Sequence, residues 1–113
     1  MARDPSLEDR LRAALAEAGP LVWKSMMGGY CAMKDGHLLA SATRRDGEGL
    51  FLFRLGRVAA EEALRRGIVR PLRAGLRTMP GYVEIPAESC DEAALRRWVV
   101  LALAEVGRLP PKG

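Results

Sequence analysis

The chain has 113 residues, 49% of them hydrophobic and 28% charged, which is the size and balance of one globular domain. Its formal net charge of +4 permits attraction to anions, but it is too modest to indicate nucleic-acid binding by itself. No segment has the apolar length of a membrane span or a signal peptide, so we expect a cytoplasmic protein without membrane contact. Fifteen arginines against three lysines, with seventeen alanines, indicate a GC-rich bacterial genome.

The first predicted element is a helix near the N-terminus. Asp4 is suited to cap it, and Pro5 is suited to its first turn. Apolar residues then recur at helical spacing from Leu7 to Ala18, and Gly19-Pro20 ends the pattern.

Four strands are expected next. They are predicted at residues 21–27, 30–34, 37–43 and 50–55. Gly28-Gly29 interrupts the chain between the first two strands. Asp35-Gly36 predicts a two-residue hairpin turn between the second and third, because both central positions of that turn need positive φ. A polar loop over residues 44–49 leads to the fourth strand, which is nearly continuous in apolar character.

The following stretch is predicted to hold a short helix and one or two strands. The helix is expected over residues 58–66, and Gly67 ends it. Pro71 and Gly75 interrupt any regular pattern in the next ten residues, so no secondary structure is assigned to that segment. A strand is then expected over residues 78–85.

The last predicted element is a helix with a capping box formed by Ser89 and Glu92. Its apolar stripe consists of Leu95, Trp98, Val99, Ala102 and Val106. The order of elements is thus about α-β-β-β-β-α-β(β)-α. We expect an α+β fold and a single domain over residues 1–113.

Five short motifs occur in a fixed order along the chain. They are Met26–Gly29, the Asp35-Gly36 turn, Met79–Tyr82, Arg97–Val99 and Leu109–Lys112. Each is weak alone, but together they resemble the N-terminal domain of the TfoX/Sxy competence-regulator family. Members usually carry phenylalanine where Met27 stands, and the segment over residues 57–77 matches loosely.

This resemblance implies a two-layer α+β sandwich, in which helices pack on an antiparallel sheet. It further implies the short stand-alone form of the family, without the C-terminal domain of the full-length relatives. Those relatives regulate natural competence and are thought to assist a cyclic-AMP-responsive activator. The resemblance therefore implies a non-catalytic regulatory or protein-interaction module of unknown exact role.

Residues suited to catalysis are few. Gly28-Gly29 separates two expected strands, so it predicts a tight bend and not a phosphate-binding loop, which needs a following helix. His37 is the sole histidine, and a general base needs a positioned partner. Of the two cysteines, both expected to be free and buried, Cys90 precedes a helix and is better suited to reactivity than Cys31.

Glu84 is expected on the solvent face of its strand, with no second carboxylate beside it. An enzyme would require His37, Glu84 or Cys90 to meet in one deep pocket. We therefore expect no catalytic residue, no metal site and no cofactor.

Arginines are the candidate residues for binding an anion or a partner. They are Arg44, Arg45, Arg65, Arg66, Arg70, Arg73 and Arg77. The planar guanidinium group of arginine can donate two parallel hydrogen bonds to a carboxylate or a phosphate. The favoured interpretation of this cluster is nevertheless a solvated and partly salt-bridged surface. We predict contact with a protein partner, including a second copy of the chain, through a sheet edge or this segment. The alternative is weak, sequence-nonspecific nucleic-acid binding through the same arginines.

Overall fold

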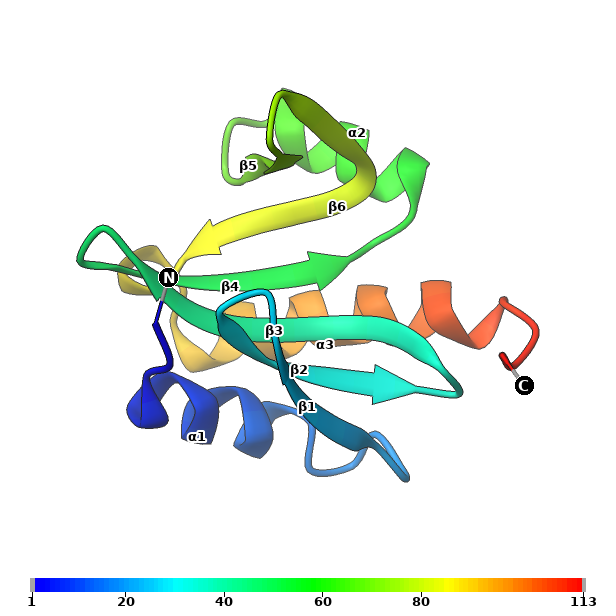
Figure 1. Cartoon of the computed structure of the whole chain (residues 1–113). Helices are drawn as coiled ribbons and strands as arrows, with labels where there is room; N and C mark the ends of the chain where they lie inside the picture. Colours follow the sequence, from blue (N-terminus) through cyan, green and yellow to red (C-terminus); the bar gives the residue numbers. More distant parts are fainter. Residues whose placement is uncertain (1, 113) are drawn as a thin grey trace.

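Within residues 2–112, which the computed structural model describes, six antiparallel strands form one sheet and three α-helices pack on one of its faces (Figure 1). The strands are β1 (Val22–Met26), β2 (Gly29–Lys34), β3 (His37–Arg45), β4 (Glu48–Arg54), β5 (Arg70–Ala74) and β6 (Arg77–Pro86). The helices are α1 (Pro5–Ala14), α2 (Arg57–Arg65) and α3 (Glu92–Gly107), with a 3-10 turn (Ala87–Ser89) before α3. The strand order is β1-β2-β3-β4-β6-β5. The predicted two-layer α+β sandwich is confirmed.

Three consecutive strand connections are two-residue turns of the same kind. Met27-Gly28 joins β1 to β2, Asp35-Gly36 joins β2 to β3, and Asp46-Gly47 joins β3 to β4. The first residue of each pair has a φ angle between 52° and 55°, and the glycine that follows it has a φ angle between 74° and 82°. Positive φ at both residues is what a type I′ hairpin turn requires. The Asp35-Gly36 prediction is confirmed. The polar loop expected over residues 44–49 was wrong, because β3 and β4 extend into it and leave only the Asp46-Gly47 turn between them.

Gly29 follows the first of these turns and has no room for a side chain. A Cβ atom at this position would lie 2.9 Å from the carbonyl oxygen of Ala42 on β3. The predicted tight bend between two strands is present but lies one residue earlier, at Met27-Gly28, with Gly29 as the first residue of β2, and a strand follows it instead of a helix.

The hydrophobic core lies between the sheet and the helices. Phe51 and Phe53 of β4 point toward the helices and have no exposed surface. α1 packs against β3 and α3, α3 packs against β3 and β4, and α2 packs against β6. The inward stripe of α3 contains four of the predicted residues: Leu95, Val99, Ala102 and Val106. The opposite face of the sheet carries no helix within residues 2–112 (Figure 1), and we call it the open face.

α3 begins later than its predicted capping box. Asp91 is the N-cap, and its carboxylate accepts a hydrogen bond of 2.8 Å from the backbone N–H of Ala94. Ser89 instead ends the 3-10 turn. The predicted Ser89 cap was wrong because the 3-10 turn keeps the chain out of α-helical geometry until after Asp91.

Candidate partner-binding surface

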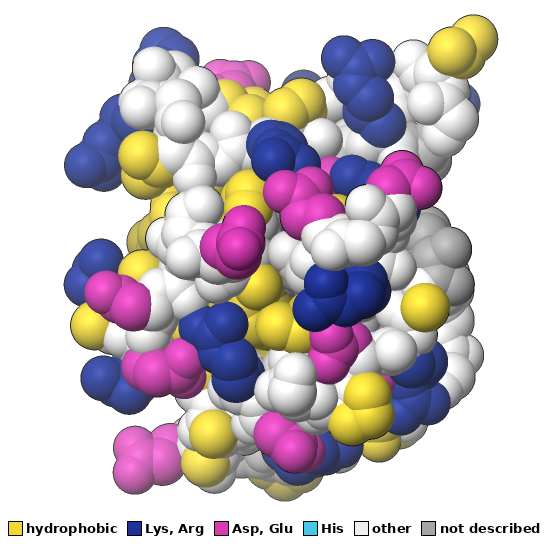
Figure 2. Space-filling model, turned by 90° about the vertical axis from the view of Figure 1, so that its left-hand side faces the viewer, with side chains coloured by type: hydrophobic (Ala, Val, Ile, Leu, Met, Phe, Trp, Pro, Cys, Tyr) yellow, Lys and Arg dark blue, Asp and Glu magenta, His cyan; other side chains and the backbone are white. Residues whose placement is uncertain are grey.

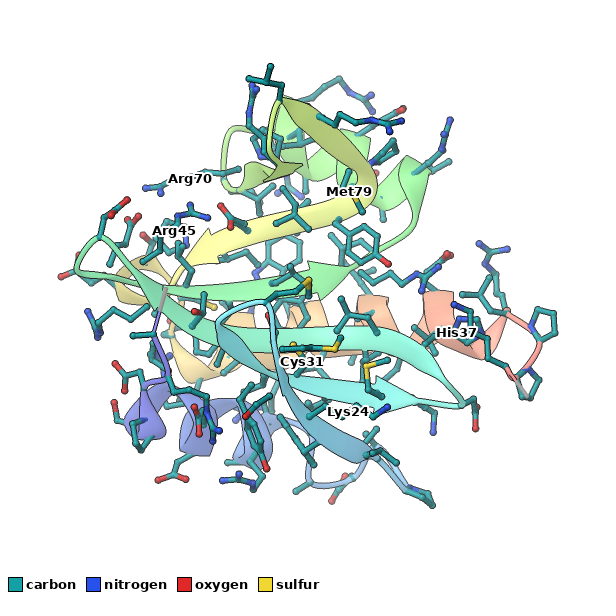
Figure 3. All side chains as sticks on the ribbon, viewed as in Figure 1. Lys24, Cys31, His37, Arg45, Arg70 and Met79 are labelled. Carbon is teal, nitrogen blue, oxygen red and sulfur yellow. The ribbon has the colours of Figure 1, made fainter. Side chains whose placement is uncertain are left out.

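Two of the predicted binding arginines lie on the open face of the sheet, where carboxylates hold them. Arg45 donates two hydrogen bonds to Glu84, at 2.7 and 2.9 Å, and Arg70 donates two to Glu48, at 2.6 and 2.9 Å. Figure 3 shows both arginines toward the same end of the sheet. The Glu84 side chain is 8% exposed. The prediction that Glu84 faces solvent was wrong, because its strand lies between β4 and β5 and the Arg45 guanidinium covers it.

Arg44 is also held by the fold. Its Nε donates a hydrogen bond of 2.8 Å to Asp4, and its Nη1 donates one of 2.8 Å to the Gly47 carbonyl. Asp4 caps α1 as predicted, because it accepts from the backbone N–H groups of Ser6 and Leu7. Hydrogen bonds from the Ser6 hydroxyl and from Arg44 lower the pKa of Asp4 to about 2. This arginine therefore stabilises the N-terminal segment.

The other four predicted arginines remain free. Arg65 and Arg66 lie at the end of α2, Arg73 lies in β5 and Arg77 in β6. None of the four forms an ion pair within residues 2–112. The seven arginines thus do not form one patch: carboxylates engage three of them, and the free ones gather around α2 and the β5–β6 hairpin.

α2 and α3 flank an open groove on the helix side of the molecule. One part of it has a volume of about 510 Å³ and adjoins a second part of about 750 Å³. We call the two parts together the α2–α3 groove. Its apolar lining includes Ala59, Ala63, Ile68, Ile85, Ala94, Trp98 and Leu101. Figure 2 views the end of the molecule at which α3 begins, and it shows hydrophobic surface exposed among charged side chains.

The rim of the α2–α3 groove carries free arginines. Arg57 and Arg66 come from α2, or its C-cap, and Arg97 comes from α3. None of these three forms an ion pair with any residue that the structure describes. Arg108 also lines the groove but donates to Glu105.

Large apolar side chains are exposed on the same pair of helices. Val58 of α2 and Leu101 of α3, which both line the groove, are 79% and 42% exposed, whereas Val100, which is 65% exposed, lies outside the lining. This surface was not among the sites predicted from the sequence. The signal was present, since the run from Trp98 to Leu101 is apolar without interruption and is wider than one helical stripe can bury.

His37 anchors the C-terminal tail. Its Nε2 lies 2.7 Å from the carbonyl oxygen of Pro110, and the Lys112 N–H donates to the Asp35 carbonyl at 2.8 Å. A Cβ atom at Gly36 would lie only 2.5 Å from the Cβ of Lys112, so the tail packs directly on the β2–β3 turn. The side chain of His37 is buried, and its Nδ1 has no hydrogen-bond partner among the described residues.

The three residues considered for catalysis lie in different parts of the molecule. Cys90 precedes the start of α3, His37 contacts the tail beyond the other end of α3, and Glu84 lies on the open face. Burial raises the pKa of the thiol of both Cys90 and Cys31, which disfavours the reactive thiolate. The arrangement therefore does not assemble a nucleophile with a base.

Among residues 2–112, no group of three or more His, Cys, Asp or Glu side chains is placed to hold a metal ion. Within the same range, none of the helices combines the length and the apolar character needed to cross a membrane.

Comparison with protein families matches the TfoX N-terminal domain over residues 13–106, which include every strand, α2 and all of α3 but its last residue. Neither the comparison with curated proteins nor that with solved structures found a match. The match extends over most of the chain and agrees with the motifs and with the sandwich of helices on an antiparallel sheet. The chain therefore belongs to the TfoX N-terminal domain family.

Proposed function

We propose that this chain is a non-catalytic regulatory module that binds a protein partner through the α2–α3 groove. One observation carries the proposal: exposed apolar side chains and unpaired arginines occur together around one concave surface. Trp and Arg are the residues that most often dominate the binding energy of protein interfaces, and Trp98 and Arg97 line the groove side by side. The family supports the regulatory part of the proposal.

The sheet edges are less suited to pairing with a partner. β5 is an edge strand of five residues, and its Pro71 lacks a backbone N–H to donate. β1, the other edge, is equally short and carries Lys24, a charged residue that discourages edge-to-edge pairing. We therefore place the proposed contact on the helices and not on an edge.

Weak nucleic-acid binding is the alternative function, and the free Arg65, Arg66, Arg73 and Arg77 favour it. A labelled random duplex titrated at low and at physiological salt tests it by fluorescence anisotropy. Binding that falls steeply with salt and weakens in the Arg65→Ala/Arg66→Ala variant would support this alternative. No binding at low salt would exclude it.

Site-specific photo-crosslinking tests the proposed function. A photoreactive amino acid would replace Leu101 in the groove, Val22 on the β1 edge or Leu76 in the β5–β6 turn, all of which are exposed. Each variant would be expressed in the cells that make the protein. We expect a discrete adduct with another protein from position 101. Adducts from position 22 or 76 alone would place the binding surface on the β1 edge or the β5–β6 turn instead. If none of the three positions gave an adduct, that result would contradict the proposed module.

A further inference from the structure

We infer that the occupant of the α2–α3 groove is an acidic amphipathic helix of a protein partner. The inference rests on the proposed function and adds the chemistry of the ligand to it. Three properties of the groove lead to it: its length, its apolar lining and the sign of its free charges.

The length and walls of the groove suit a helix. Along α3, the lining residues run from Ala94 through Leu101 to Arg108, which at a rise of 1.5 Å per residue corresponds to about 20 Å. A helix of about 14 residues has the same length. The walls are helices, whose backbone groups already bond within each helix, so an extended peptide would find few hydrogen-bond partners. A helix satisfies its own backbone and needs only side-chain contacts.

The lining supplies the apolar part of the contact. Trp98 is half-buried, and Leu101 and Ile68 are 42% and 49% exposed, so each still presents surface that a ligand can cover. A ligand helix with apolar residues at positions i, i+3, i+4 and i+7 would place one stripe against these side chains.

The free charges select an acidic ligand. After Arg108 and Glu105 are paired with each other, the lining retains Arg57, Arg66 and Arg97 against a single carboxylate, Glu62. The arginines come from both walls, so acidic residues on both flanks of a bound helix would meet a cation. A basic helix would meet like charges, which suppresses binding.

A second copy of the chain fits this groove poorly. In a symmetric dimer the same surface meets itself, so two linings that each carry three free arginines and one free carboxylate would face each other. An acidic segment avoids this repulsion, and the unpaired state of the arginines in the described chain leaves them available for it.

The experiment is a titration of the isotope-labelled full chain with a synthetic peptide, followed by two-dimensional NMR. The peptide has about 15 residues, with leucines on one face and glutamates elsewhere. One control peptide has the same composition in scrambled order, and another has lysine in place of each glutamate. We expect saturable shifts of the groove signals with the first peptide and no saturable shifts with either control.

Neighbouring residues provide matched controls on the protein. Arg97→Glu and Leu101→Glu change the groove lining, and each should weaken binding about tenfold or more. Arg96→Glu and Val100→Glu alter exposed neighbours outside the lining and should leave the affinity within about twofold. Circular dichroism of all four variants checks that each is folded.

Several outcomes would overturn the inference. They are the absence of shifts at about 1 mM peptide, shifts centred on another surface, equal binding of the lysine peptide, and equal loss in the variants at positions 96 and 97. A dimer of the chain alone that Leu101→Glu dissociates would assign the groove to a second copy. If the peptide fails but position 101 still crosslinks to a protein, the module stands and only the acidic helix is rejected. If both fail, the proposed function fails as well.

Discussion

The two ion pairs on the open face provide a test of how burial determines the value of a salt bridge. Arg45–Glu84 and Arg70–Glu48 have nearly the same bidentate geometry. They differ in exposure: the Glu84 side chain is 8% exposed and the Glu48 side chain 37%. The perturbation is to replace each arginine separately by methionine, which keeps an unbranched apolar stem and removes the charge.

The expected magnitudes follow from what each substitution leaves behind. Arg45→Met removes the guanidinium that both pairs with the Glu84 carboxylate and covers it, and losing one partner of a buried pair typically costs about 3–5 kcal/mol. Arg45 is itself 37% exposed. Water that enters beside it would therefore reduce the loss to about 2–3 kcal/mol. Arg70→Met leaves Glu48 in solvent, so we expect no measurable loss of stability.

The assay is urea unfolding at neutral pH, monitored by circular dichroism, with thermal melting as a second measurement. For a chain of this size, the loss in Arg45→Met should lower Tm by roughly 10 °C. Adding Glu84→Gln to Arg45→Met should recover part of the loss, because it removes the uncompensated charge. Equal losses in the two arginine variants, or no recovery with Glu84→Gln, would refute the argument that burial makes the difference.

Three further predictions concern the N-terminal cap, the first turn and the thiols. Asp4→Ala should cost about 1 kcal/mol at neutral pH as a lost helix cap. Because folding lowers the pKa of Asp4 from 3.8 to about 2, its contribution is complete above pH 3.8 and is lost as the pH falls toward 2, so the variant and the parent should converge there in acid unfolding. A constant difference down to pH 2 would contradict this. Met27→Asn should raise stability by about 1 kcal/mol in urea unfolding, because Met27 has φ of 55° and asparagine tolerates that region better; an unchanged midpoint would argue against strain. Cys31 and Cys90 should react with a thiol reagent only after unfolding, because both are buried, and rapid labelling of the native protein would disagree with the structure.

Much of the fold could be predicted because it depends on local patterns. The Asp35-Gly36 turn, the continuous apolar run of β4 and the stripe of α3 each involve residues that are near one another in sequence. β5 could not be assigned, because Pro71 argues against a strand in the middle of a sheet and is tolerated here only because β5 is at the edge and pairs irregularly with β6. Sequence alone does not tell an edge strand from a central one.

The binding surface was harder to predict, because it depends on which charges find a partner. Arg45 pairs with Glu84 across 39 residues and Arg70 with Glu48 across 22, so both pairs exist only in the observed strand register. Arg66 has the same side chain but forms no ion pair with the residues that the structure describes, and it lines the α2–α3 groove. A count of arginines therefore overestimates the available positive charge. A partner encounters only the arginines that remain unpaired after folding, and several of these surround an apolar groove.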